Sequence, residues 1–253
     1  MVHLAFNHAR YGLYGECRLE ELKAPFPPHF HDYYTLGMLL SGTREITIQG
    51  KSKLLQPFEP VIINPGDVHS CHKTGSFNSV WLCLSLSCSI IREFTGQNSK
   101  YSNWPGANES FQIAAIFSEM QAMPTEDALS EILKILRSIP TQKENKDFEF
   151  IRTYPQSPAW PGLERLGINE GMNKFSFLRS FRRKMQLTPY RYYENLRLTR
   201  CCKLLAQGMG LVHCAQAAGY CDQSHMNRQF RKYLGFTPGL YQRAIRSIPE
   251  WKA

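Results

Sequence analysis

Two stretches near the end of the chain repeat one arginine-bearing pattern at a constant offset of 49 residues. The first is Phe177-Leu178-Arg179-Ser180-Phe181-Arg182-Arg183, and the second is Met226-Asn227-Arg228-Gln229-Phe230-Arg231-Lys232. Thr188-Pro189 and Thr237-Pro238 follow at the same offset. An arginine side chain can donate two hydrogen bonds to guanine or pair with a phosphate. A basic helix that occurs twice in register therefore indicates a protein that binds DNA.

Three histidines ahead of this repeat form a second set of candidate residues. His29 and His31 are two positions apart on a predicted strand and so share one face, and His69 lies near another strand end. Three converging imidazoles can hold iron, nickel or zinc, but Tyr34–Leu39 supplies no carboxylate and only Asp32 is close. We therefore expect no metal and no cofactor. The histidines either line a pocket for a small polar effector, which we favour, or satisfy hydrogen bonds at strand ends.

The positive charge is concentrated in the part of the chain that carries the repeat. The formal net charge is +9, and residues 156–253 hold 16 Lys and Arg against 5 Asp and Glu. Residues 1–155 hold 14 against 16. This balance predicts a polyanionic partner for the C-terminal part only. A chain of 253 residues is long enough for two domains, each with its own core.

Short alternating runs with Gly and Pro between them predict a β sandwich or small barrel from about His29 to Leu86. The expected strands are Tyr34–Leu40, Arg44–Ile48 and Val61–Ile63, with a hairpin turn at Gln49-Gly50-Lys51 and a turn at Asn64-Pro65-Gly66-Asp67. Two helices are expected next, Phe111–Met123 with Ser110 as its N-cap, and Leu129–Ser138.

The second of these helices has an apolar stripe at helical spacing, formed by Leu129, Ile132, Leu133, Leu136 and Ile139. The stripe fits two interpretations. It packs onto the barrel, or it is the seam of a dimer. The pattern alone does not separate them.

Each copy of the repeat predicts a helix-turn-helix unit. In the first unit we expect a helix with Leu163 and Leu166, a turn at Gly171, and a second helix Lys174–Met185 capped by Asn173. In the second unit the corresponding features are an apolar stripe of Leu211, Cys214, Ala215 and Ala218, the turn at Gly219, and the helix Gln223–Leu234. A helix over Tyr190–Leu205 would hold the two units at a fixed separation.

Other classes of protein are disfavoured. The N-terminus has no signal-peptide pattern, and Val80–Cys88 is too short to span a bilayer. The 8 cysteines contain no CxxC and are expected to be buried, reduced thiols in a cytoplasmic protein. No Ser/His/Asp arrangement or phosphate-binding glycine loop is present, so we do not expect an enzyme. RNA binding is disfavoured because no aromatic stacking platform accompanies the basic residues.

The repeat also has a family resemblance. Phe181-Arg182-Arg183, Leu187-Thr188-Pro189, Asn195-Leu196-Arg197-Leu198, Ala218-Gly219-Tyr220, Phe230-Arg231-Lys232 and Gly235-Phe236-Thr237-Pro238 closely resemble the AraC/XylS family of bacterial transcription regulators over residues 160–243. His29-Phe30-His31, Gly42 and Asn64–His69 resemble the cupin-type effector-binding domain of such regulators. Gly167 stands where the family usually has Ala, and Pro155, Pro158 and Pro161 precede the first unit. Both departures lower the expected stability of that unit.

The resemblance implies roles for particular side chains. Base-reading positions fall on Phe175, Leu178 and Arg179 in the first unit and on Gln223, Ser224, His225 and Arg228 in the second, with Ser176 exposed on the same face. Arg182, Arg183, Arg231 and Lys232 are expected to pair with phosphates. His29, His31 and His69 are the candidate effector-pocket residues.

These observations together predict an α+β protein of two domains. A cupin-like β-barrel followed by helices, residues 10–140, would sense an effector and dimerise through those helices. Residues 141–159 would be a linker, and residues 160–246 an all-α DNA-binding domain with two helix-turn-helix units. The predicted function is a sequence-specific transcription regulator controlled by a small molecule; the alternative is a metal-dependent cupin enzyme with a DNA-binding appendage. Expected partners are double-stranded DNA and the effector, with RNA polymerase and a second copy of the chain as further candidates, and no membrane.

Overall fold

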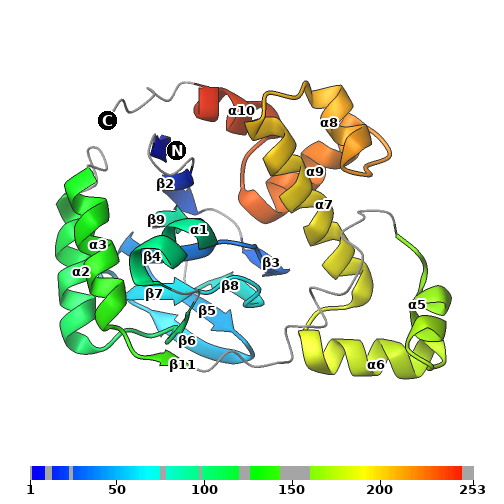
Figure 1. Cartoon of the computed structure of the whole chain (residues 1–253), viewed down its shortest axis with the longest axis horizontal. Coiled ribbons are helices and arrows are strands. Elements are labelled where there is room, and N and C mark those ends of the chain that lie inside the picture. The colour runs from blue at the N-terminus through cyan, green and yellow to red at the C-terminus, as the bar shows by residue number, and fades with distance from the viewer. Residues whose placement is uncertain are drawn as a thin grey trace.

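The computed structural model describes residues 2–8, 13–22, 25–74, 78–96, 99–119, 126–142 and 160–246. Among these residues, two larger antiparallel sheets, a short two-stranded ladder and three helices make up the N-terminal part, and the C-terminal part is helical (Figure 1). Residues 143–159, most of the predicted linker, lie outside the described residues, as do residues 120–123 at the predicted end of the first helix.

The first sheet has the strand order β1 (Val2–His8), β2 (Leu13–Leu22), β9 (Ser79–Leu86), β4 (Tyr34–Ser41) and β7 (Pro60–Ile63). The second has the order β3 (Phe26–His29), β8 (His69–Lys73), β5 (Arg44–Ile48) and β6 (Lys51–Leu55). A short ladder pairs β10 (Lys100–Tyr101) with β11 (Thr141–Gln142). The predicted β architecture is therefore confirmed. The predicted domain boundaries at residues 10, 140 and 160 remain predictions. Strand β1 lies before residue 10, and strand β11 lies after residue 140.

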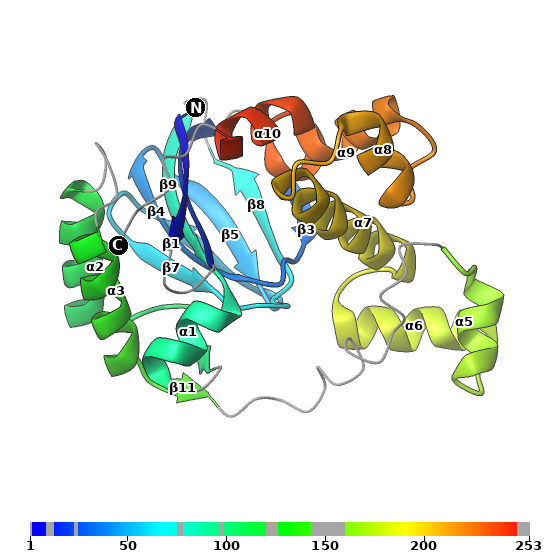
Figure 2. The ribbon, with the colours of Figure 1, turned by 45° about the horizontal axis from the view of Figure 1, so that its top comes forward.

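Alternation along the strands divides the β domain into two apolar layers. Leu39, Ile46 and Val61 pack between the sheets, whereas residues of the other parity, such as Met38 and Leu82, face the helices. Those helices are α1 (Cys88–Thr95), α2 (Ala107–Glu119) and α3 (Glu126–Ser138), and Figure 2 shows α2 and α3 side by side against one edge of the β domain. All five residues of the predicted stripe on α3 are buried in this core. The packing interpretation of that stripe is confirmed.

Two turns follow from local sequence. Gln49 and Gly50 both have positive φ, 50° and 76°, as a tight two-residue turn between β5 and β6 requires. Gly66 has φ 80° in the predicted turn before β8. The structure differs at Ser110, which is not an N-cap, because α2 begins earlier at Ala107 and the Ser110 amide already donates to the Gly106 carbonyl.

Other elements were not predicted. Helix α1 follows β9 directly. The Ser87 hydroxyl caps it by accepting from the Ile90 amide, and Gly96 ends it at φ 82°. The cysteines were expected to be buried. Cys83, Cys201 and Cys214 are buried, but the expectation is wrong for Cys221, which is exposed in the turn before α9. No disulfide joins the cysteines whose side chains are described.

The C-terminal part consists of α5 (Leu163–Asn169), α6 (Lys174–Met185), α7 (Pro189–Ala206), α8 (Leu211–Ala217), α9 (Gln223–Leu234) and α10 (Pro238–Arg246). Helices α5 and α6 form one helix-turn-helix unit and α8 and α9 the other, with α7 running between them (Figure 1). Thr188 caps α7 and Pro189 occupies its first turn, where a missing amide proton costs nothing. In the described part of the chain no helix is both long enough and apolar enough to cross a membrane.

Candidate functional site

The second helix of each unit is defined by its own caps. The Asn173 side chain accepts hydrogen bonds from the Phe175 and Ser176 amides at the start of α6, and Asp222 accepts from the His225 amide at the start of α9. Gln186 and Gly235 end the two helices in the left-handed region. The bounds of both helices and the Asn173 cap are as predicted from sequence. The turn glycines Gly171 and Gly219 have φ 65° and 81°.

Burial separates the core face of each helix from its outer face. Phe177, Phe181 and Met185 are buried on α6, and Met226, Phe230 and Tyr233 on α9. Of the predicted DNA-contacting residues, Phe175, Arg179, Arg182, Arg183, Ser224, Arg228 and Lys232 are exposed, and Ser176, Leu178, Gln223 and His225 are half-buried. The whole predicted set therefore lies off the buried stripes.

Two of these side chains have neighbours that bear on their predicted roles. The His225 ring packs edge-on against Tyr220, with 5.3 Å between centroids. The Lys232 ammonium lies 4.7 Å from the centre of the Tyr233 ring and 3.8 Å from Glu194 Oε2. Arg228 is exposed in the middle of α9.

Gly167 allows the first turn to close. The Met172 amide donates to the Gly167 carbonyl at 2.8 Å, and the equivalent bond in the second unit runs from Tyr220 to Ala215 at 2.9 Å. The first turn is one residue shorter, so the chain returns closer to the helix. A Cβ atom at residue 167 would lie 2.7 Å from the Met172 carbonyl oxygen. The glycine that helix propensity marks as a weakness is therefore a steric requirement of the shorter turn.

We expect Gly167→Ala to destabilise the first unit by about 1–2 kcal/mol, because the added methyl group overpacks the turn. Helix propensity alone predicts the opposite sign, a gain of about 1 kcal/mol. Chemical unfolding monitored by circular dichroism measures the difference. The matched control is Ala215→Gly in the second unit, which should lose about 1 kcal/mol by propensity. A more stable Gly167→Ala variant would contradict the steric argument.

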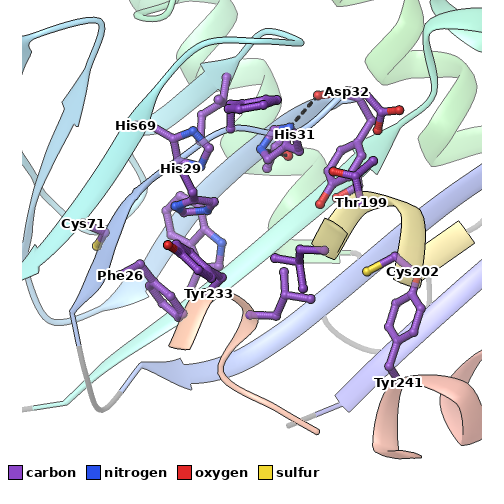
Figure 3. Close-up of a pocket in the computed structure, with 18 of the residues that line it drawn as sticks. Phe26, His29, His31, Asp32, His69, Cys71, Thr199, Cys202, Tyr233 and Tyr241 are labelled. Atoms are coloured by element: carbon purple, nitrogen blue, oxygen red, sulfur yellow. Dashed lines mark hydrogen bonds between the residues drawn. The ribbon is translucent and has the colours of Figure 1, made fainter. Parts of the chain in front are cut away.

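A cavity of about 410 Å³ lies between the two sheets and the helical part (Figure 3). The β domain contributes the three predicted histidines, Thr35, Arg44, Ile46, Trp81 and Ser85, among others. The helical part contributes Leu198, Thr199, Cys202 and Lys203 from α7, Tyr233 and Leu234 from α9, and Tyr241 from α10. The cavity is thus shared between the β domain and the second helix-turn-helix unit.

The structure brings the three predicted histidines together at this cavity. The ring centroids of His29 and His69 are 4.1 Å apart, and those of His31 and His69 are 4.9 Å apart. Each Nδ1 lies 2.7–2.9 Å from a backbone carbonyl oxygen two residues away, those of Pro27, Tyr33 and Asp67. A carbonyl only accepts, so Nδ1 is the protonated nitrogen in all three rings. The histidines therefore both satisfy local hydrogen bonds and line the cavity.

No group of three His, Cys, Asp or Glu side chains in the described residues is placed to hold a metal ion. The Nε2 atom of His31 is an acceptor in the neutral ring, and Thr35 Oγ1 lies 3.2 Å from it, so the threonine hydroxyl donates. No observation in the described part of the chain favours the alternative of a metal-dependent cupin enzyme.

One short segment after β3 contacts both DNA-binding units. The Phe30 amide donates to Asn195 Oδ1 on α7 at 2.8 Å, and the Phe30 ring stacks on Tyr192 with 5.1 Å between centroids. Phe30 belongs to the same buried cluster as Phe177 and Phe181 of the first unit. A side chain of the sensory domain therefore completes the core of the first helix-turn-helix unit.

The flanking residues of this segment reach the second unit. The His29 ring lies 5.9 Å from the Tyr233 ring of α9, and Asp32 pairs with Lys203 of α7 at 2.5 Å. Tyr233 donates to Glu194 Oε2 at 3.0 Å, and Gln229 donates to Glu194 Oε1 at 3.0 Å. Burial, and then the Glu194 charge, raise the pKa of Tyr233, so its hydroxyl remains a donor at neutral pH. The buried Glu194 carboxylate thereby ties α9 to α7 beside the cavity.

Sequence reasoning missed several cavity residues. Thr35 and Ser85 are directly paired across β4 and β9, and strand alternation could have placed both on the inner face. Tyr233 of α9 is a second case, because no local pattern shows that it contacts the other domain.

Comparison with known proteins agrees with this architecture. A family model described as a helix-turn-helix domain matches residues 169–244, and one described as an AraC-like ligand binding domain matches residues 18–155. An uncharacterized HTH-type transcriptional regulator of Bacillus subtilis, YbfI, is 28% identical over 83% of this chain and 84% of its own length. The probable transcriptional regulator LumQ of Photobacterium leiognathi is 26% identical over 90% of this chain and 97% of its own length.

Solved structures show the same two-domain fold. ToxT of Vibrio cholerae superposes with a TM-score of 0.57 and 10% identity, covering 92% of this chain and 99% of that one. Its unsaturated fatty acid-bound form superposes with a TM-score of 0.54 and 12% identity, covering 93% and 97%. Since the AraC-like ligand-binding model alone spans more than half of the residues and is followed by a helix-turn-helix domain, this protein belongs to the AraC family of transcriptional regulators.

Proposed function

We propose that this regulator places α6 and α9 in successive major-groove segments on one face of DNA, under the control of an effector held in the cavity between its domains. The observation that supports the DNA-binding part best is the tandem arrangement of two capped helices with arginines on their outer faces, joined through the single helix α7. An α-helix fits the major groove, where base edges can be distinguished.

The two helices present different chemistry to the bases. On α9 the predicted readers Gln223, Ser224, His225 and Arg228 are polar, which suits hydrogen bonding to adenine and guanine. On α6 Phe175 is 64% exposed and Leu178 lies one turn further along beside Arg179. Apolar side chains at such positions contact the methyl group of thymine. We infer that the first unit reads thymine-rich sequence and the second reads purine hydrogen-bonding patterns.

Arg228→Ala is expected to lose discrimination at one or two base pairs, by about 1–3 kcal/mol, because a bidentate contact to guanine is removed. Selection of bound sequences from random DNA, with wild type and variant in parallel, measures this loss. Arg182→Ala is the matched contrast, since loss of a phosphate contact should weaken binding to all sequences alike and reduce the salt dependence. Identical base preferences for Arg228→Ala and wild type would reject the assignment.

The effector site is proposed to be the cavity lined by His29, His31 and His69. Its position supports this assignment, because any molecule held there touches strands of the sensory domain and helices α7 and α9 at once. An effector that prefers one relative placement of these elements shifts the population toward it. The fatty acid bound by ToxT, a regulator of the same fold, supports control by a small organic molecule.

Further parts of the proposal rest on the same architecture. We propose that the protein acts in the cytoplasm, where its DNA target lies, and that RNA polymerase is a downstream partner. A homodimer is proposed to form through the surface of the β domain and its helices. It cannot use the α3 stripe, because those side chains are buried in the core of one chain. The proposed cytoplasmic DNA-binding role does not require catalysis.

A further inference from the structure

We propose that the effector has an apolar, aromatic body and a carbonyl or carboxylate oxygen at one end, and that Ser85 donates a hydrogen bond to this oxygen. The inference rests on the proposed role of the cavity as the effector site and names the ligand chemistry that fits it.

Ser85 is the residue on which the inference depends. It lies on β9 with its side chain among the cavity-lining residues, and it is only 5% exposed. Its hydroxyl oxygen is buried and has no hydrogen-bond partner in the described part of the chain. Buried hydroxyl groups in proteins are normally paired, because an unpaired one has lost its water without compensation. A ligand atom at this end of the cavity would supply the pair.

The surroundings of Ser85 indicate whether the ligand atom beside it donates or accepts a hydrogen bond. Thr35 lies directly opposite on β4, and its proton is directed to His31 Nε2. The Ser85 proton has no such acceptor among the described residues. Arg44 also lines the cavity, but its guanidinium donates to Ser79 and Cys71, so it lies on the Phe26 side, at the other end of β9 from Ser85. A ligand oxygen accepts the Ser85 proton, whereas a ligand group that only donates would leave this buried proton unpaired.

Much of the remaining lining is apolar and rich in rings. Ile46, Leu55 and Ile63 contribute aliphatic surface from the strands, and Leu234 does so from α9. Phe26 and Tyr233 lie together at the side away from Asp32 in Figure 3. Aromatic side chains of this kind contact a ligand ring in offset or edge-on geometry. A largely apolar molecule with an oxygen that reaches Ser85 therefore fits this lining.

Trp81 sets the inner limit of the apolar part. Its indole lies over Gly37 on the neighbouring strand, so closely that a Cβ atom at residue 37 would overlap the ring. Gly37 thus leaves room for the indole against the sheet and keeps the cavity open. At about 30 Å³ for each water-sized group, the volume of about 410 Å³ admits roughly a dozen non-hydrogen atoms. That is the size of a substituted benzene.

The test uses three shape-related probes with the full chain. They are 4-fluoroacetophenone, which has a carbonyl oxygen, 4-fluorophenylacetate, which has a carboxylate, and 4-fluoroisopropylbenzene, which has no oxygen. Fluorine NMR titration gives the dissociation constant of each. At least one oxygen-bearing probe is expected to bind about tenfold more tightly than the oxygen-free one. Which of the two binds more tightly distinguishes a neutral carbonyl from a carboxylate.

Ser85→Ala is expected to abolish this preference while changing the affinity for 4-fluoroisopropylbenzene less than twofold. Ser52→Ala, at an exposed position of β6, is the matched control and should behave as wild type. Gly37→Ala is expected to weaken all three probes, because the indole is displaced into the cavity. The proposal is overturned if the preference survives in Ser85→Ala, if Gly37→Ala binds the probes as wild type does, or if no oxygen-bearing probe is preferred by wild type.

The same protein samples are used to select sequences from random DNA. A protein that selects a DNA sequence but prefers no oxygen-bearing probe would retain the proposed regulator function and lose only the ligand assignment. A protein that shows the probe preference but selects no DNA sequence would lose the DNA-binding proposal and keep the ligand assignment.

Discussion

Replacing Phe30 with alanine is expected to loosen the first helix-turn-helix unit while leaving the second in place. The Phe30 ring is 7% exposed and packs in one cluster with Phe177, Phe181 and Tyr192. Truncating a buried phenylalanine typically costs about 3–5 kcal/mol, since contacts are lost and a cavity remains. In this protein the lost contacts are those between the β domain and α6. Effector control of the first unit should be lost together with its rigid placement.

Hydrogen exchange of the α5 and α6 amides measures the loosening directly, because exchange reports local opening. A footprint on a selected DNA sequence should show protection retained in the segment bound by α9 and reduced in the segment bound by α6. Phe58→Ala is the matched control, since Phe58 belongs to the same domain and is 51% exposed. Unchanged exchange in α5 and α6 of the Phe30 variant would show that the sensory domain does not support the first unit.

Replacing Asp67 with asparagine is expected to destabilise the β domain by about 2–3 kcal/mol at neutral pH. Asp67 is fully buried, and both of its carboxylate oxygens accept hydrogen bonds. Oδ2 accepts from the Asn64 amide and side chain and from Asn103, and Oδ1 accepts from Gln49 and lies 3.3 Å from Lys100 Nζ. The asparagine side chain has one accepting oxygen, and an NH2 group replaces the other oxygen. This NH2 group would face a hydrogen-bond donor that now binds the carboxylate.

Asp67 is also expected to make the stability of the β domain depend on pH in the acid range. Burial by itself raises the pKa of the Asp67 carboxyl, but hydrogen bonds from Asn103, Asn64 and Gln49, with the Lys100 charge, outweigh burial and lower it below its ordinary value. A lowered pKa in the folded state contributes stability that is present above the unfolded value, about 3.9 for Asp. That stability is lost as the pH falls from there through the folded pKa.

Chemical unfolding between neutral pH and pH 3 should therefore show a steeper loss of stability in wild type than in Asp67→Asn, which has no proton to take up at this site. Glu59→Gln is the matched control, because Glu59 pairs with Lys53 at the exposed surface of the same domain. If the free energy of unfolding falls equally with pH in wild type and Asp67→Asn, Asp67 is not the source of the acid sensitivity. The loop also holds His69, whose Nδ1 donates to the Asp67 carbonyl, so probe binding in the cavity should weaken with the loop.

Local interactions explain which elements could be predicted from the sequence. Helices α6 and α9 have side-chain N-caps, buried stripes at helical spacing and left-handed C-caps, all within a few residues of one another. The Gln49-Gly50 hairpin is specified in the same way. Helix α1 was missed because its apolar pair Ile90-Ile91 continues the hydrophobic run of β9, and only the Ser87 cap and Gly96 mark the change.

The sequence by itself determined the class of partner, because two basic helices in register, their caps and their turn glycines are written in neighbouring residues. It also named three histidines of one cavity, because strand parity puts His29 and His31 on one face. Only the tertiary structure decided the rest. It placed the α3 stripe in the core, made Gly167 a steric requirement rather than a weakness, and put Phe30 of one domain into the core of another. These properties depend on contacts between residues that are far apart in the chain. Local propensity and periodicity do not show which distant residues will meet.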